Sequence, residues 1–177
     1  MKALAGLALW CALSSGVAHA WSPDDPLHGV DIGMSQPALD ELVASSGADL
    51  RCRSMSAITN RGAVDVQRCT ADLAVDRRLA VVLAAGPKGA RVVAFEVQGP
   101  AAGATAVREQ LVKRWGAPQL SKSAASASVE MARWLLGARL LVLSDGCRQR
   151  QSFCIQYSEN GWARQAANAA GMDFAPP

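Results

Sequence analysis

The chain has 177 residues, of which 50% are hydrophobic, 19% are charged and 5% are aromatic. This composition is typical of a globular protein, because disordered chains are more polar and helical membrane proteins contain longer apolar stretches. The formal charge of +3 arises from 18 basic and 15 acidic residues that are spread along the sequence. A nucleic-acid groove needs clustered Lys and Arg with interleaved aromatics, so we expect no nucleic-acid partner.

The first twenty residues have the pattern of a secretory signal peptide. Met1 and Lys2 form a basic start, residues 3–17 are mostly apolar, and Ala18-His19-Ala20 places small residues before the expected cleavage site. The apolar run is shorter than the roughly 20 residues that a membrane span needs. We therefore expect a signal peptide over 1–20 and a single domain over 21–177 that is periplasmic or secreted and has no transmembrane segment.

Four cysteines follow this signal peptide, and an even number in an oxidising compartment predicts two disulfides. Four cysteines allow three pairings, among which the hairpins predicted below favour the sequential one. No pair has the C-x-x-C spacing of a thiol oxidoreductase, which argues against redox catalysis.

The first half of the mature chain predicts one helix followed by four strands. Ser35 can cap a helix whose apolar positions are Leu39, Leu42 and Val43. Gly47 ends this helix. Alternating apolar residues then predict two hairpins, with strands over 50–59, 63–73, 79–85 and 91–98.

The first hairpin predicts the first disulfide. The sequence Asn60-Arg61-Gly62 suits the positive φ of a tight turn, and a turn centred on Asn60 and Arg61 places Cys52 opposite Cys69. Directly opposed residues have the separation that a disulfide requires. We therefore expect a Cys52–Cys69 bridge.

The second half predicts a helix over 104–115, where Ala104, Val107, Leu111 and Trp115 form an apolar stripe that ends at Gly116. A Ser/Ala/Lys-rich exposed loop is expected over 120–128. Cys147 and Cys154 should pair across a turn near Arg150-Gln151. Strands are predicted over 129–136, 139–144 and 152–158, followed by a loosely packed terminal helix over 160–170.

This order predicts an α+β protein of two tandem units, each with a helix and an antiparallel β-sheet, plus a short C-terminal helix and two disulfides. The half-repeats span about residues 30–100 and 101–177.

Two short motifs carry a resemblance to known exported proteins. Gly33-Met34-Ser35, followed by Leu39 and Val43, resembles the opening of the small outer-membrane lipoproteins of the BamE (SmpA/OmlA) group. The second helix is similar to the ending of related proteins, and a tandem of such units resembles the β-lactamase-inhibitor-protein fold. The residues that carry this second match are Val107, Leu111, Arg114, Trp115, Gly116 and Pro118. The resemblance implies helices docked on a sheet in a cell-envelope protein.

Catalytic motifs are scarce. His28 is the one histidine after the signal peptide, so a catalytic triad would depend on it, and the Gly-x-Ser-x-Gly elbow is missing. Asp24, Asp25 and Asp31 lie near His28, but such residues are commonly solvated in an N-terminal segment. Gly86 to Gly89 joins two strands, so it is a turn and not a phosphate-binding loop. We expect no catalytic, cofactor-binding or metal-binding residues and no cofactor.

Two tryptophans and two arginines are candidate interaction residues. Trp115 and Trp134 lie on apolar faces and are expected in the core. Trp21 and Trp162 lie in segments with weak burial patterns and can anchor an interface. Arg148 and Arg150 should form a basic tip beside the second disulfide.

These features predict an exported, periplasmic, non-enzymatic protein that binds another protein or the envelope surface. One alternative is a small secreted hydrolase or metal-dependent enzyme that uses His28. Another is an inhibitor of an exported enzyme, acting through loop tips such as residues 148–151.

Overall fold

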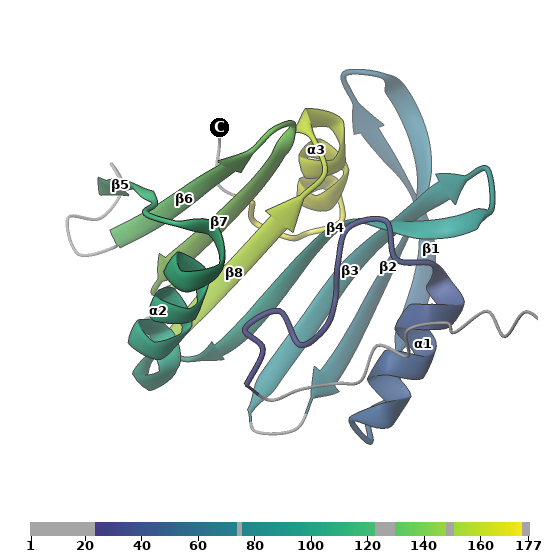
Figure 1. Ribbon diagram of the computed structural model, residues 1–177. Coiled ribbons are helices and arrows are strands. Elements are labelled where there is room, and N and C mark those ends of the chain that lie inside the picture. The colour runs from purple at the N-terminus through teal and green to yellow at the C-terminus, as the bar shows by residue number, and fades with distance from the viewer. Residues whose placement is uncertain (1–23, 74–75, 123–129, 148–150, 175–177) are drawn as a thin grey trace, which may run out of the picture.

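The computed structural model describes residues 24–73, 76–122, 130–147 and 151–174. In this part of the chain, three α-helices flank one antiparallel sheet of eight strands (Figure 1). In chain order the elements are α1 (Gln36–Ser45), β1 (Arg51–Thr59), β2 (Gly62–Leu73), β3 (Arg77–Gly86), β4 (Gly89–Pro100), a 3₁₀ turn (Ala101–Gly103), α2 (Ala104–Trp115), β5 (Gln119–Lys122), β6 (Glu130–Leu136), β7 (Arg139–Asp145), β8 (Ser152–Ser158) and α3 (Gly161–Ala169).

The strand order in the sheet is β1-β2-β3-β4-β8-β7-β6-β5. Strands β4 and β8 therefore pair in the middle, and β1 and β5 are the two edges. This arrangement confirms the α+β class, although the sheet makes up most of the ordered structure.

Most predicted elements lie where the sequence patterns place them. Helix α2 has the predicted bounds, because its apolar stripe faces the sheet and Gly116, at φ 80°, ends it. The first hairpin has the predicted register, with Cys52 directly opposite Cys69. Of the three turn residues in that hairpin, Gly62 alone has a positive φ, at 92°.

Two local predictions are wrong. Of the exposed loop expected over 120–128, residues 120–122 instead belong to β5, which pairs with β6 through Leu120 opposite Ala132, and residues 123–128 lie outside the described residues. A four-residue edge strand has too little alternation to be recognised from its sequence. Ser35 makes no side-chain cap to α1, and its backbone instead forms an isolated bridge with Arg91 of β4.

One face of the sheet, which we call the first face, carries the larger core. Helices α1 and α2 cover it near its two ends, and the segment over residues 24–35 runs between them (Figure 1). Leu39 and Leu111, one from each helix, are 0% exposed, as is Phe95 at the centre of β4. Trp134 is buried in this cluster and Trp115 packs against it, which confirms their expected core positions.

The opposite, second face carries a smaller core under α3. Asn160 caps this helix, since its side chain accepts a hydrogen bond from the Ala163 backbone N–H at 3.2 Å. Ala163, Ala166 and Ala167 are all 0% exposed against the sheet. The expectation of a loosely packed terminal helix is therefore wrong, because small alanine side chains let the helix approach the strands closely.

Both expected disulfides are present. Cys52–Cys69 links β1 to β2, and Cys147–Cys154 closes the turn between β7 and β8. Cys52 and Cys69 are directly opposed, whereas Cys147 lies two residues beyond the end of β7 and Cys154 is opposite Ser144. Neither bridge ties the two ends of the sheet together.

Candidate functional site

Four arginines share the part of the second face that lies beyond α3. The strand registers place Arg51 and Arg53 of β1, Arg68 of β2 and Arg78 of β3 on this face. We call these four residues the arginine surface. Arg51 and Arg78 are well exposed, with side chains 74% and 57% accessible, whereas Arg68 is half-buried.

Two of these arginines oppose each other directly. Arg53 and Arg68 are cross-strand partners between β1 and β2. Like charges in this position destabilise a sheet. The register thus places these two positive charges side by side on the second face.

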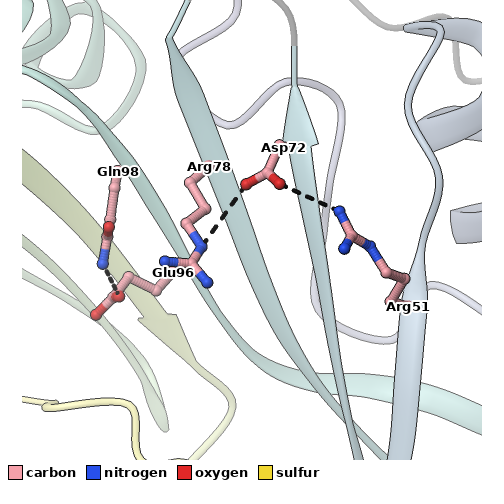
Figure 2. A network of polar contacts seen from close by, with 5 residues as sticks. All are labelled: Arg51, Asp72, Arg78, Glu96 and Gln98. Atoms are coloured by element: carbon pink, nitrogen blue, oxygen red, sulfur yellow. Dashed lines mark hydrogen bonds and ion pairs between the residues drawn. The ribbon is translucent and has the colours of Figure 1, made fainter.

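A single carboxylate within this group makes ion pairs with two of the arginines. Asp72 lies 3.3 Å from Nη2 of Arg51 and 3.9 Å from Nε of Arg78, so the three side chains bridge three adjacent strands (Figure 2). All three are more than half exposed, and ion pairs in water contribute only about 0–1 kcal/mol each. The arginine surface keeps an excess of positive charge.

Next to the arginine surface lies a buried carboxylate, Glu96 of β4, which is 2% exposed. One carboxylate oxygen accepts a hydrogen bond from Nε2 of Gln98 at 2.7 Å (Figure 2), and the other accepts from Nε2 of Gln156 at 2.7 Å. The same Gln156 nitrogen also donates to the backbone oxygen of Asp173 at 2.8 Å. Glu96 therefore orients the amide that holds the C-terminal segment on the sheet.

We expect Glu96→Ala to lower the free energy of unfolding by about 1.5–3 kcal/mol, because the buried amide of Gln156 and the half-buried amide of Gln98 lose a charged acceptor. Hydrogen exchange at residues 171–174 should rise as well, since Gln156 is no longer held in place. Chemical denaturation and exchange mass spectrometry measure the two effects. Glu109→Ala, an exposed change on α2, is the control and should alter stability by less than about 0.5 kcal/mol. Unchanged stability in Glu96→Ala would contradict the role assigned to this carboxylate.

A hollow of about 370 Å³ adjoins the arginine surface at the ends of β3, β4 and β8. The hollow is open to solvent, and both polar and apolar atoms line it. Its lining comprises Asp76, Arg78, Gln98, Gly99, Pro100, Gln151 and Ser152. Arg78 belongs to both features, so the hollow adjoins the arginine surface directly.

A fifth arginine of this region has a structural role. Arg77 points to the first face, where its guanidinium lies 4.6 Å from the ring centroid of Phe153. Burial lowers the pKa of Arg77 from its ordinary value, though an arginine stays charged at neutral pH. A Cβ at Gly99 would clash with the Arg77 side chain and lie 2.8 Å from Cζ of Phe153, so a larger residue there would disturb this packing.

Of the interaction residues suggested by the sequence, Trp162 is the one within the described residues. It is half-buried, packs against the core under α3 and has the Arg61 guanidinium 5.6 Å from its ring centroid. Trp162 thus joins α3 to the tip of the first hairpin. Trp21, Arg148 and Arg150 lie outside the described residues.

The acidic and imidazole group near the N-terminus is not assembled as a site. His28 is 2% exposed, with φ at 53°. Asp25 instead accepts hydrogen bonds from the backbone N–H groups of Leu27 and Gly29. Across the described ranges, no group of three or more His, Cys, Asp or Glu side chains is placed to hold a metal ion.

The arginine surface was missed at the sequence level, although a signal for it exists. Arg51 and Arg53 alternate within a predicted strand and therefore share a face. Which face they share, and that Arg68 and Arg78 join them, follows only from the strand pairing.

No protein-family model, curated protein or solved structure matches this chain. In the part of the chain that the structure describes, no helix combines the length and apolarity required to cross a bilayer.

Proposed function

We propose that this chain is an exported, non-enzymatic protein of the periplasm or the extracellular space that binds another protein or the envelope surface. The arginine surface is the observation that carries the proposal. It presents several positive charges on a rigid sheet, and such surfaces attract and orient negatively charged partners.

Two further features support this proposal. The two disulfides are compatible with an oxidising compartment, as is the signal-peptide pattern over residues 1–20. The first face is covered by two helices and a loop, whereas the second face is covered in part by α3 and the segment that follows it. Among the described residues, no helix lies on the rest of the second face, so its strands are the available surface.

The proposed ancestry is a duplicated unit of one helix and four strands. Helix α1 precedes β1 to β4, and α2 precedes β5 to β8, with the two sets joined through β4 and β8. This order supports the resemblance to BamE-like and β-lactamase-inhibitor-protein-like folds. This architecture favours a binding role on the sheet over a catalytic one. Helices α1 and α2 both pack on the first face, which leaves strand surface on the second face for a partner.

The two alternatives receive less support from particular residues. An enzyme using His28 needs that imidazole to reach a substrate, but the side chain is 2% exposed. An inhibitor acting through residues 148–151 depends on a loop of which only Gln151 is described.

The proposed function predicts that charge reversal on the arginine surface weakens partner binding at least about tenfold. The test is the double variant Arg53→Glu/Arg78→Glu, compared with Lys88→Glu/Lys113→Glu, which changes the net charge equally at exposed sites elsewhere. Site-specific photo-cross-linking in the native cell envelope, followed by quantitative mass spectrometry, gives the readout. A partner captured equally well by both variants would refute a binding role for this surface.

A further inference from the structure

Strand β1 is the longer of the two edge strands of the sheet. It has nine residues, Arg51–Thr59, whereas the opposite edge strand β5 has four. Within the described residues, β1 pairs with β2 on one side and with no strand on the other. The outer side of an edge strand carries backbone N–H and C=O groups that can pair with another chain.

The first disulfide identifies which residues carry these outward groups. The Cα atoms of Cys52 and Cys69 are 4.0 Å apart, the short separation of a non-hydrogen-bonded antiparallel pair. Cys52 therefore directs its N–H and C=O away from β2. The register has no shift along β1, so Ser54, Ser56 and Ile58 do the same.

Residues 51–54, 56 and 58 of β1 are exposed, and their side chains lie in two sets. On the second face, Arg51 and Arg53 lie two residues apart, with Arg68 directly behind Arg53. On the first face, Ser54 and Ser56 are small and exposed, and the apolar Ile58 is 74% exposed. The edge thus offers backbone groups, two adjacent positive charges and one apolar contact.

We propose that β1 binds an extended acidic segment of another protein, which adds to the sheet antiparallel to β1 and places carboxylates at alternate positions beside Arg51 and Arg53. This inference rests on the proposed function and names the kind of partner. Backbone hydrogen bonds supply a sequence-independent part of the affinity in such strand addition, and alternate side chains supply the specificity. Antiparallel pairing matches the rest of the sheet and is slightly more stable than parallel pairing.

Charge favours this occupant over a second copy of the chain. Strand β1 contains two arginines and no Asp or Glu, so another β1 would add positive charge and no counter-charge. Charged residues on an edge strand are a common means by which proteins limit self-association. An acidic strand instead places carboxylates beside the exposed Arg51 and Arg53.

The test uses the full mature chain and a capped nine-residue peptide of Thr and Val with two glutamates separated by one valine. We expect measurable binding by isothermal titration calorimetry. Moving the glutamates to adjacent positions places one on each face of the strand, and this control peptide should bind about tenfold more weakly. N-methylation of the residues between and flanking the glutamates removes the N–H groups that face β1 and should abolish binding. N-methylation of the glutamates removes N–H groups that face away from β1, so binding should persist.

Two protein variants separate the edge from the charges. Ser56→Pro removes an outward N–H without breaking the β1–β2 ladder and should abolish peptide binding. Arg51→Glu/Arg53→Glu should weaken peptide binding about tenfold, whereas Lys88→Glu/Lys113→Glu should leave the affinity for the peptide unchanged. The peptide series on the unchanged protein keeps the test valid if either variant folds poorly.

Several results would overturn the inference. The first is peptide binding that survives both patterns of N-methylation. The second is that no peptide binds. The third is that the free protein forms concentration-dependent dimers that Ser56→Pro abolishes. Binding to anionic phosphatidylglycerol vesicles that Ser56→Pro leaves unchanged, without peptide binding, also overturns it and assigns the arginines to a lipid surface. If the peptides fail but Arg53→Glu/Arg78→Glu still abolishes partner capture, the proposed function stands and strand addition alone is wrong.

Discussion

We expect Phe95→Ala to lower the free energy of unfolding by about 3–5 kcal/mol, the range for deleting a large aromatic side chain from a core. Phe95 is 0% exposed and lies on β4, directly opposite Val81 and Tyr157 of the two neighbouring strands. Its ring meets that of Tyr157 edge to face at 5.6 Å. The truncation removes this contact and leaves a cavity at the join between the two sets of strands.

Chemical denaturation of Phe95→Ala measures this loss, and the melting temperature should fall by roughly 2–4 °C for each kcal/mol. The matched control is Leu135→Ala on β6, where the side chain is 64% exposed and the expected change is within about 0.5 kcal/mol. A loss below about 1.5 kcal/mol in Phe95→Ala would contradict a tightly packed centre around β4 and β8.

The second large effect concerns the disulfides. Removing the Cys52–Cys69 bridge with Cys52→Ala/Cys69→Ala should cost about 3 kcal/mol, and removing Cys147–Cys154 in the same way about 2.5 kcal/mol. The difference arises because the first bridge spans 17 residues and the second spans 7, so the first closes the longer loop in the unfolded chain. Both variants should fold, since the two cores do not depend on a bridge between distant strands.

Urea denaturation of the two double variants checks this order. Non-reducing peptide mapping of the unchanged protein provides the control, because each bridge should yield one linked peptide from its own hairpin. A larger loss on removing Cys147–Cys154 would show that local packing, and not loop closure, sets the contribution of the bridges. Beyond stability, loss of the Cys52–Cys69 bridge should loosen β1 and so weaken strand addition at the edge.

The candidate site could be anticipated only in part. The alternation of Arg51 and Arg53 places them on one side of a strand, but the sequence does not tell whether that side meets α1 or lies beyond α3. Trp162 lies in a polar, Ala-rich segment whose sequence does not show what its indole contacts. In the structure it packs against the core under α3 and beside Arg61, a residue about 100 positions away in the chain.

Local elements with short-range signals follow from the residue pattern alone. The stripe from Ala104 to Trp115 specifies a helix through contacts three and four residues apart, and the turn at Asn60 and Arg61 sets the register that brings Cys52 to Cys69. The pairing of β4 with β8, the packing of α3 on part of the second face and the edge position of β5 appear only once the chain has folded. These features depend on contacts between distant segments, whose free energy comes from burying surface that no local pattern specifies. The arginine surface is of this second kind, since it exists only where three strands have been aligned.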